Sequence, residues 1–137
     1  MAPLLLNICE LSCIEVSALT SPTLIPGHGI LIGDQEFDNI PLVGLAKCEL
    51  SSKVENKTRT FTAVLSAHLC SSFDAREKNF VFLARCVNGD RYLIGSALRP
   101  YPLVNTSVSL PGSPTEPSRH SITVEYTSTS GLLRVLD

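Results

Sequence analysis

The fold is decided by residues 79–100, which run from Asn79 to Pro100 and read Asn-Phe-Val-Phe-Leu-Ala-Arg-Cys-Val-Asn-Gly-Asp-Arg-Tyr-Leu-Ile-Gly-Ser-Ala-Leu-Arg-Pro. Two apolar runs flank Asn88-Gly89, a dipeptide that favours a two-residue type I′ hairpin turn. This turn predicts a register in which Val87 faces Asp90. Because side chains alternate along a strand, one face should carry Phe80, Phe82, Ala84 and Leu93, and the other Val81, Leu83 and Ile94. Both faces are apolar, so we expect a hairpin that is covered on both sides.

Alternation predicts further strands on both sides of this hairpin. Residues 58–69 alternate most cleanly, and residues 119–127 do so with Ile122, Val124 and Tyr126 facing inward. Strands are also expected at residues 4–18, 30–33, 42–50, 101–110 and 132–136, with the proline-containing 101–110 at a sheet edge. Residues 51–57 read as a polar connection, and residues 71–78 as a short helix capped by Ser71. The chain therefore predicts one all-β domain over residues 1–137, an antiparallel β-sandwich or barrel-like domain with one short connecting helix.

Composition points to a protein that hides more apolar surface than one small core needs. Of the 137 residues, 44% are hydrophobic and 18% are charged, against a typical charged share of about 25%. Two interpretations fit this excess: an unusually well-buried β domain, or a subunit that covers apolar surface in an assembly. The net charge is -2 and the basic residues are scattered, so we expect no sequence-specific nucleic-acid contact.

The cysteines and the N-terminus indicate a protein that is not secreted. The first residues lack a basic segment before their apolar run, and no run approaches the ~20 apolar residues of a membrane helix. The five cysteines are an odd number without framework spacing, so reduced thiols are expected. Cys9 and Cys13 should share one strand face, about 13 Å apart, which is too far for a disulfide.

Catalytic patterns are absent from the sequence. Nucleophile-elbow, phosphate-loop, dinucleotide and zinc-protease motifs do not occur. His28 lies in a glycine-flanked loop, and His68 lies on the polar face of its strand, so we expect both to be solvated. The acidic segment 34–39 lacks the central glycine and the final glutamate of a calcium loop. We therefore expect no enzyme, no catalytic residue, and no cofactor or metal site.

The order of segments resembles a known family. An alternating strand (residues 58–69), a short polar helix, Phe-Val-Phe-Leu, Asn-Gly, Arg-Tyr-Leu-Ile-Gly-Ser, a Pro/Ser loop and a closing strand (residues 120–126) follow one another. Over roughly residues 58–128 this looks like small virion proteins of tailed bacteriophages, in particular tail-tube and tail-associated subunits. The resemblance implies a subunit made in the host cytoplasm and located in the virion, where it forms rings with copies of itself and contacts other virion proteins. In a tube it would touch DNA only passively, and no functional residues transfer.

Two hypotheses follow. The first is a structural subunit of a bacteriophage virion, a tail or tail-tube protein, whose loop at residues 111–118 is suited to reaching a neighbour. The alternative is a monomeric β-sandwich binding module for a carbohydrate or protein. Such a module normally exposes aromatic side chains for stacking, whereas this chain has no Trp and only 6% aromatic residues.

Overall fold

A computed structural model describes residues 4–19, 23–25, 29–33, 35–69, 79–95, 101–109, 119–128 and 133–136. The elements in these ranges are β1 (Leu4–Glu15), the 3₁₀ helix η1 (Val16–Ala18), β2 (Thr23–Ile25), β3 (Gly29–Leu31), β4 (Asp38–Ile40), β5 (Ala46–Glu55), β6 (Thr58–Leu69), β7 (Phe80–Cys86), β8 (Arg91–Ile94), β9 (Leu103–Ser109), β10 (Arg119–Ser128) and β11 (Leu133–Arg134). The predicted helix at 71–78 and the predicted loop at 111–118 lie outside the described residues. None of the described helices is long and apolar enough to cross a membrane.

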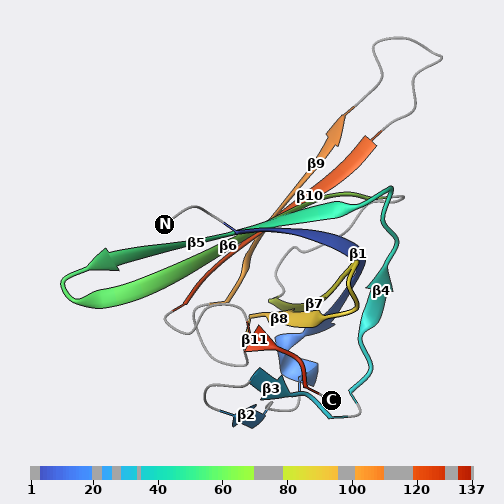
Figure 1. Ribbon diagram of the computed structural model, residues 1–137. Helices are drawn as coiled ribbons and strands as arrows, with labels where there is room; N and C mark the ends of the chain where they lie inside the picture. The colour runs from blue at the N-terminus through green and yellow to red at the C-terminus, as the bar shows by residue number, and fades with distance from the viewer. Residues whose placement is uncertain are drawn as a thin grey trace.

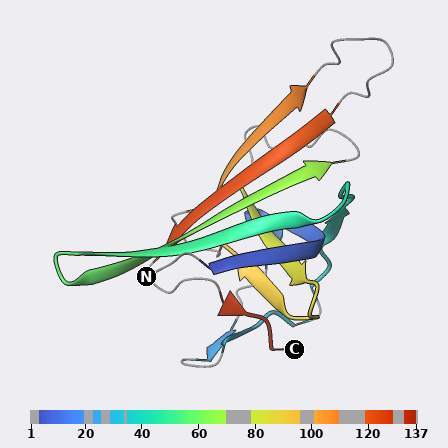
Figure 2. The same ribbon diagram turned by 45° about the horizontal axis from the view of Figure 1, so that its top comes forward.

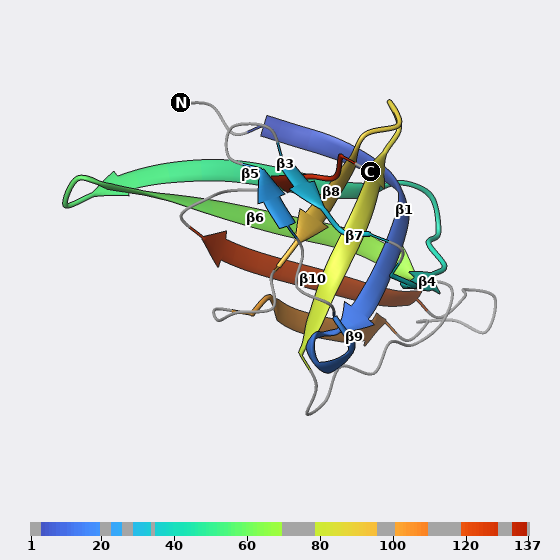
Figure 3. The same cartoon turned by 90° about the horizontal axis from the view of Figure 1, so that it is seen from below.

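The strands form one curled antiparallel sheet. Its order is β11-β8-β7-β1-β5-β6-β10-β9, with β4 pairing on β1, while β2 and β3 pair separately. The first half of β1 pairs with β5 and the second half with β7, so the sheet bends at β1. As a result β5, β6 and β10 cross over β7 and β8 to make a half-barrel (Figures 1 and 3). The all-β, barrel-like prediction is confirmed, and β9 closes one end of the strand order, as expected for an edge strand.

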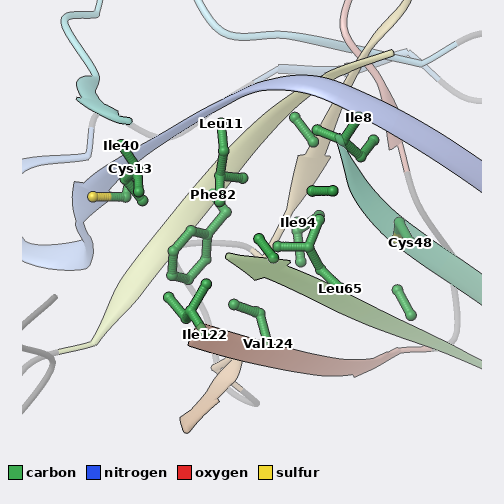
Figure 4. Packing of buried hydrophobic residues seen from close by; sticks show 14 of the residues in the cluster. Ile8, Leu11, Cys13, Ile40, Cys48, Leu65, Phe82, Ile94, Ile122 and Val124 are labelled. Carbon is green, nitrogen blue, oxygen red and sulfur yellow. The ribbon is translucent and has the colours of Figure 1, made fainter. Parts of the chain in front are cut away.

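The main core occupies the concave side of this half-barrel. Phe82 from β7 lies at its centre, surrounded by side chains from β1, β6, β8 and β10 (Figure 4). The predicted inward residues Ile122, Val124 and Tyr126 are all buried there. A second cluster covers the opposite face of β7, and its buried members are Ile14, Ile30, Ile32, Val81, Leu93 and Val135. The prediction that the β7–β8 hairpin is covered on both sides is thus confirmed.

The turn of this hairpin differs from the prediction. Leu83 pairs with Leu93 and Phe82 with Ile94, so the register is one residue away from that of a two-residue turn. The Gly89 N–H donates to the Cys86 carbonyl at 3.0 Å, and Gly89 has a φ of +98°, whereas Asn88 is not in the left-handed region. This is a three-residue loop with a left-handed glycine in its last position.

The shifted register exchanges two side chains between the faces. Ile94 joins Phe82 in the main core and Leu93 joins Val81 in the second cluster, the reverse of the predicted assignment. The loop is held by the Asn88 side chain, whose Oδ1 accepts a hydrogen bond from the Asp90 N–H at 3.1 Å. Asn-Gly therefore marks the turn correctly but does not distinguish the two turn types.

A β-bulge at Cys9 changes the faces of β1. Ile8 pairs with Cys86 and Glu10 with Arg85, so Cys9 is the extra residue. Cys9 is consequently exposed, whereas Cys13 is buried in the main core. The prediction that these two cysteines share a face is wrong, because the bulge breaks the alternation between them.

Candidate functional site

The β5–β6 hairpin extends beyond the rest of the sheet. The pairing of β5 with β1 ends at Leu50, and that of β6 with β10 begins at Phe61. Among the described strands, residues 51–60 therefore pair only within their own hairpin, and they project as a two-stranded ribbon (Figures 1 and 2). We call residues 51–60 the arm. The prediction that residues 51–57 are a polar connection is wrong, because β5 continues to Glu55.

A tight turn closes the arm. Asn56 and Lys57 have φ values of +48° and +65°, and Glu55 pairs directly with Thr58. Positive φ at both central residues is the signature of a type I′ turn, whose twist matches that of the strands it joins. The turn and the ladder hydrogen bonds keep the ribbon in register. An isolated two-stranded ribbon is nevertheless marginal in water, so covering one of its faces would stabilise it.

The two faces of the arm have different chemistry. Val54 lies opposite Arg59, and Ser52 lies opposite Phe61, on the face that continues the core surface of Cys48 and Leu65. Val54 is 59% exposed. We call this the inner face of the arm. It combines apolar side chains with one guanidinium group.

The outer face of the arm is polar throughout. It carries Lys53 opposite Thr60 and Glu55 opposite Thr58. Lys53 and Glu55 neutralise each other through an exposed ion pair of 2.6 Å. Such a pair contributes little to stability, because water screens it.

A second unusual surface crosses the convex side of the sheet. The strands β1, β5, β6, β10 and β9 lie side by side (Figure 2). Their registers place five residues in one line across the sheet. In order they are Leu5, Glu49, Val64, Glu125 and Leu103. We call them the outer row. Neighbours in such a line have Cβ atoms about 4.5–5.5 Å apart.

The outer row alternates apolar and acidic side chains on an uncovered surface. Leu5 is 55% exposed, Leu103 is 65% exposed, and Val64 is half-buried between two exposed carboxylates. The described ion pairs join other residues, so neither Glu49 nor Glu125 has a cationic partner within the described part of the chain. The adjacent line on this face is polar and consists of Asn7, Lys47, Ser66, Thr123 and Asn105.

Two of the buried cysteines, Cys13 and Cys48, are poor nucleophiles. Burial, with the nearby Asp38 and Glu15 carboxylates, raises the pKa of Cys13 to about 11. Burial also raises the pKa of Cys48 to about 11, with a smaller contribution from Cys86. These thiols stay protonated near neutral pH, and the thiolate is the reactive form. Cys70 lies outside the described residues.

The histidines and acids in the described ranges do not converge on a site. His68 pairs with Ser121 on the convex side and is exposed, whereas His120 pairs with Leu69 and faces the core side. The His120 Nδ1 atom is buried without a hydrogen-bond partner among the described residues. No group of three possible metal ligands gathers in the described ranges. His28 and Asp34 lie outside them.

Comparisons with protein-family models, with curated proteins and with solved structures find no match for this chain. The arm and the outer row are therefore assigned from their own geometry. Sequence reasoning missed both of them. The arm had a usable signal, since the polar dipeptide Asn56-Lys57 stands between two segments that can pair. The outer row had none, because its members come from five separate strands.

Proposed function

We propose that this chain is a structural subunit that works by assembling with copies of itself, and that its assembly belongs to the tail of a bacteriophage. The observation that carries the first part is the arm. An ordered ribbon whose inner face leaves Val54 and Arg59 in solvent gains stability when another surface covers it. The second part rests on the resemblance of residues 58–128 to small virion proteins.

The filled interior of the half-barrel supports a role without a small-molecule ligand. Ligand-binding barrels keep an open cavity lined by apolar and a few polar groups. Here the side chains of Phe82, Leu65 and Ile94 occupy the concave side (Figure 4). Every aromatic side chain in the described part of the chain is buried or half-buried, so these residues offer no exposed platform on which a sugar ring could stack.

Two measurements test the proposal. Size-exclusion chromatography with light scattering, at increasing protein concentration, should show a mass several times that of the 14.8 kDa chain. Mass spectrometry of particles purified from a culture that produces the chain should detect it as a virion component. A protein that stays monomeric at high concentration contradicts the assembly role, and its absence from the particles contradicts the virion assignment.

A further inference from the structure

We propose that the inner face of the arm of one copy docks on the outer row of the next copy, with Arg59 placed between Glu49 and Glu125. This inference rests on the proposed function, because it names the surfaces through which the subunits assemble. The other possible occupants of the arm, such as a different protein, are outcomes of the test below.

The first argument is chemical complementarity. The inner face presents Val54 beside Arg59, and the outer row presents Val64 between two carboxylates. An apolar contact between the valines would bring the guanidinium near both acids. Neighbouring strands lie about 4.8 Å apart, so Glu49 and Glu125 are separated by two such steps, roughly 10 Å. A planar guanidinium with five N–H donors can pair with one of these carboxylates or bridge toward both.

The second argument is that the three charged side chains of the proposed contact are unpaired within the described part of one copy. Arg59, Glu49 and Glu125 have no ion-pair partner among the described residues, whereas the charges on the outer face of the arm are already paired. On the strands of the arm the free positive charge is therefore Arg59 on the inner face, while Lys57 lies in the turn. The outer row carries two free negative charges on the convex sheet.

The third argument is that the two surfaces face opposite sides of the same sheet. The inner face of the arm continues the core side of β5 and β6, and the outer row lies on the opposite side of the same strands. A rigid ribbon cannot fold back onto the other side of its own strands, so the contact must join two copies. In the proposed arrangement the arm of each copy binds the outer row of the next copy, so the interface is heterologous. Repeated contacts of this kind close into a ring or continue as a filament.

A charge reversal on the inner face tests the contact. Arg59→Glu places three carboxylates together, and like charges across an interface are strongly unfavourable. We expect the concentration at which half of the protein is assembled to rise by at least about tenfold, since each tenfold change corresponds to about 1.4 kcal/mol. The matched control is Lys53→Glu, which makes the same charge change on the outer face of the same ribbon and should leave assembly unchanged. Circular dichroism verifies that both variants keep the β fold.

A compensating variant makes the test specific. Arg59→Glu combined with Glu49→Arg and Glu125→Arg restores opposite charges, and assembly should return. If Arg59→Glu assembles as well as the unchanged chain, or if the triple variant does not recover, the docking inference is overturned while self-assembly stands. If the unchanged chain is monomeric at every concentration, or if its arm captures a different protein instead, both this inference and the proposed assembly role fail.

Discussion

Replacing Gly95 by alanine should destabilise the fold far more than the same change at Gly89. Both glycines have strongly positive φ values, +114° and +98°. A Cβ at Gly89 meets nothing within 4 Å, whereas at Gly95 it lies 2.8 Å from Pro102 Cγ and 3.3 Å from Val81 Cγ2. The proline ring is rigid and Val81 is fully buried, so neither neighbour moves away easily.

Two separate effects determine how much each substitution lowers the free energy of unfolding. The left-handed backbone costs an L-residue about 1–2 kcal/mol, and this is the whole expected effect of Gly89→Ala. Overpacking adds about 1–3 kcal/mol, so Gly95→Ala should lower the free energy of unfolding by about 2–5 kcal/mol. Domains of ordinary stability have about 5–15 kcal/mol to lose, so most of the protein should stay folded at 25 °C.

Urea unfolding followed by tyrosine fluorescence and far-ultraviolet circular dichroism measures both variants, since the chain has no Trp. The slopes of the two transitions should agree, so that the difference lies in the midpoints. Equal losses at Gly89 and Gly95 would refute the close packing of β8 against the start of β9.

Other substitutions and reactions test the core and the thiols. Phe82→Ala should lower the free energy of unfolding in urea by about 4 kcal/mol, because about 150 Å² of aromatic surface at about 25 cal/mol/Å² is removed from the core. Val87→Ala, at an exposed position, should lower it by less than about 0.5 kcal/mol. Equal losses for the two variants would contradict the assigned core. At pH 8, iodoacetamide should modify the exposed Cys9 first. Cys13 and Cys48 should react at least about a hundredfold more slowly in the folded chain than in urea, because a pKa raised from 9.0 to about 11 lowers the thiolate fraction by that factor. Peptide mass spectrometry measures these rates, and fast labelling of either buried thiol in the folded chain would contradict its burial. The pKa of Cys13 and Cys48 is higher in the folded chain than in the unfolded chain, so the unfolded chain loses these protons first as the pH rises. The free energy of unfolding, and with it the urea midpoint, should therefore fall between about pH 9 and 11. A constant midpoint would show that both thiols keep their ordinary pKa in the folded chain.

The sequence predicts the strands well where one face of the sheet is buried. In residues 61–69 and 120–127 every second side chain faces the main core, which produces the clean alternation, and the structure pairs these two segments with each other. The arm does not show this alternation of apolar and polar side chains. Its side chains are exposed on both faces, so no apolar period marks it, and only the ladder and the turn at Asn56 and Lys57 keep it extended.

Register and faces are harder to predict than strands. One extra residue in the loop after Cys86 moves Ile94 and Leu93 to opposite clusters, and the bulge at Cys9 has the same effect on β1. A shift of one residue reverses every face in a strand. The outer row depends on four such registers at once, which explains why residues as far apart as Leu5 and Glu125 could not be brought together from the sequence.

Shortening the arm tests the central claim most directly. Ser52 and Phe61 face each other, so replacing residues 53–60 by Asn-Gly closes the hairpin with a two-residue turn in the same register. The measurement is sedimentation velocity of this variant beside the unchanged chain over a range of concentrations. We expect the unchanged chain to assemble and the shortened chain to stay monomeric. At a concentration low enough for both chains to be monomeric, their urea midpoints should be equal. A shortened chain that assembles like the unchanged one would contradict the role of the arm.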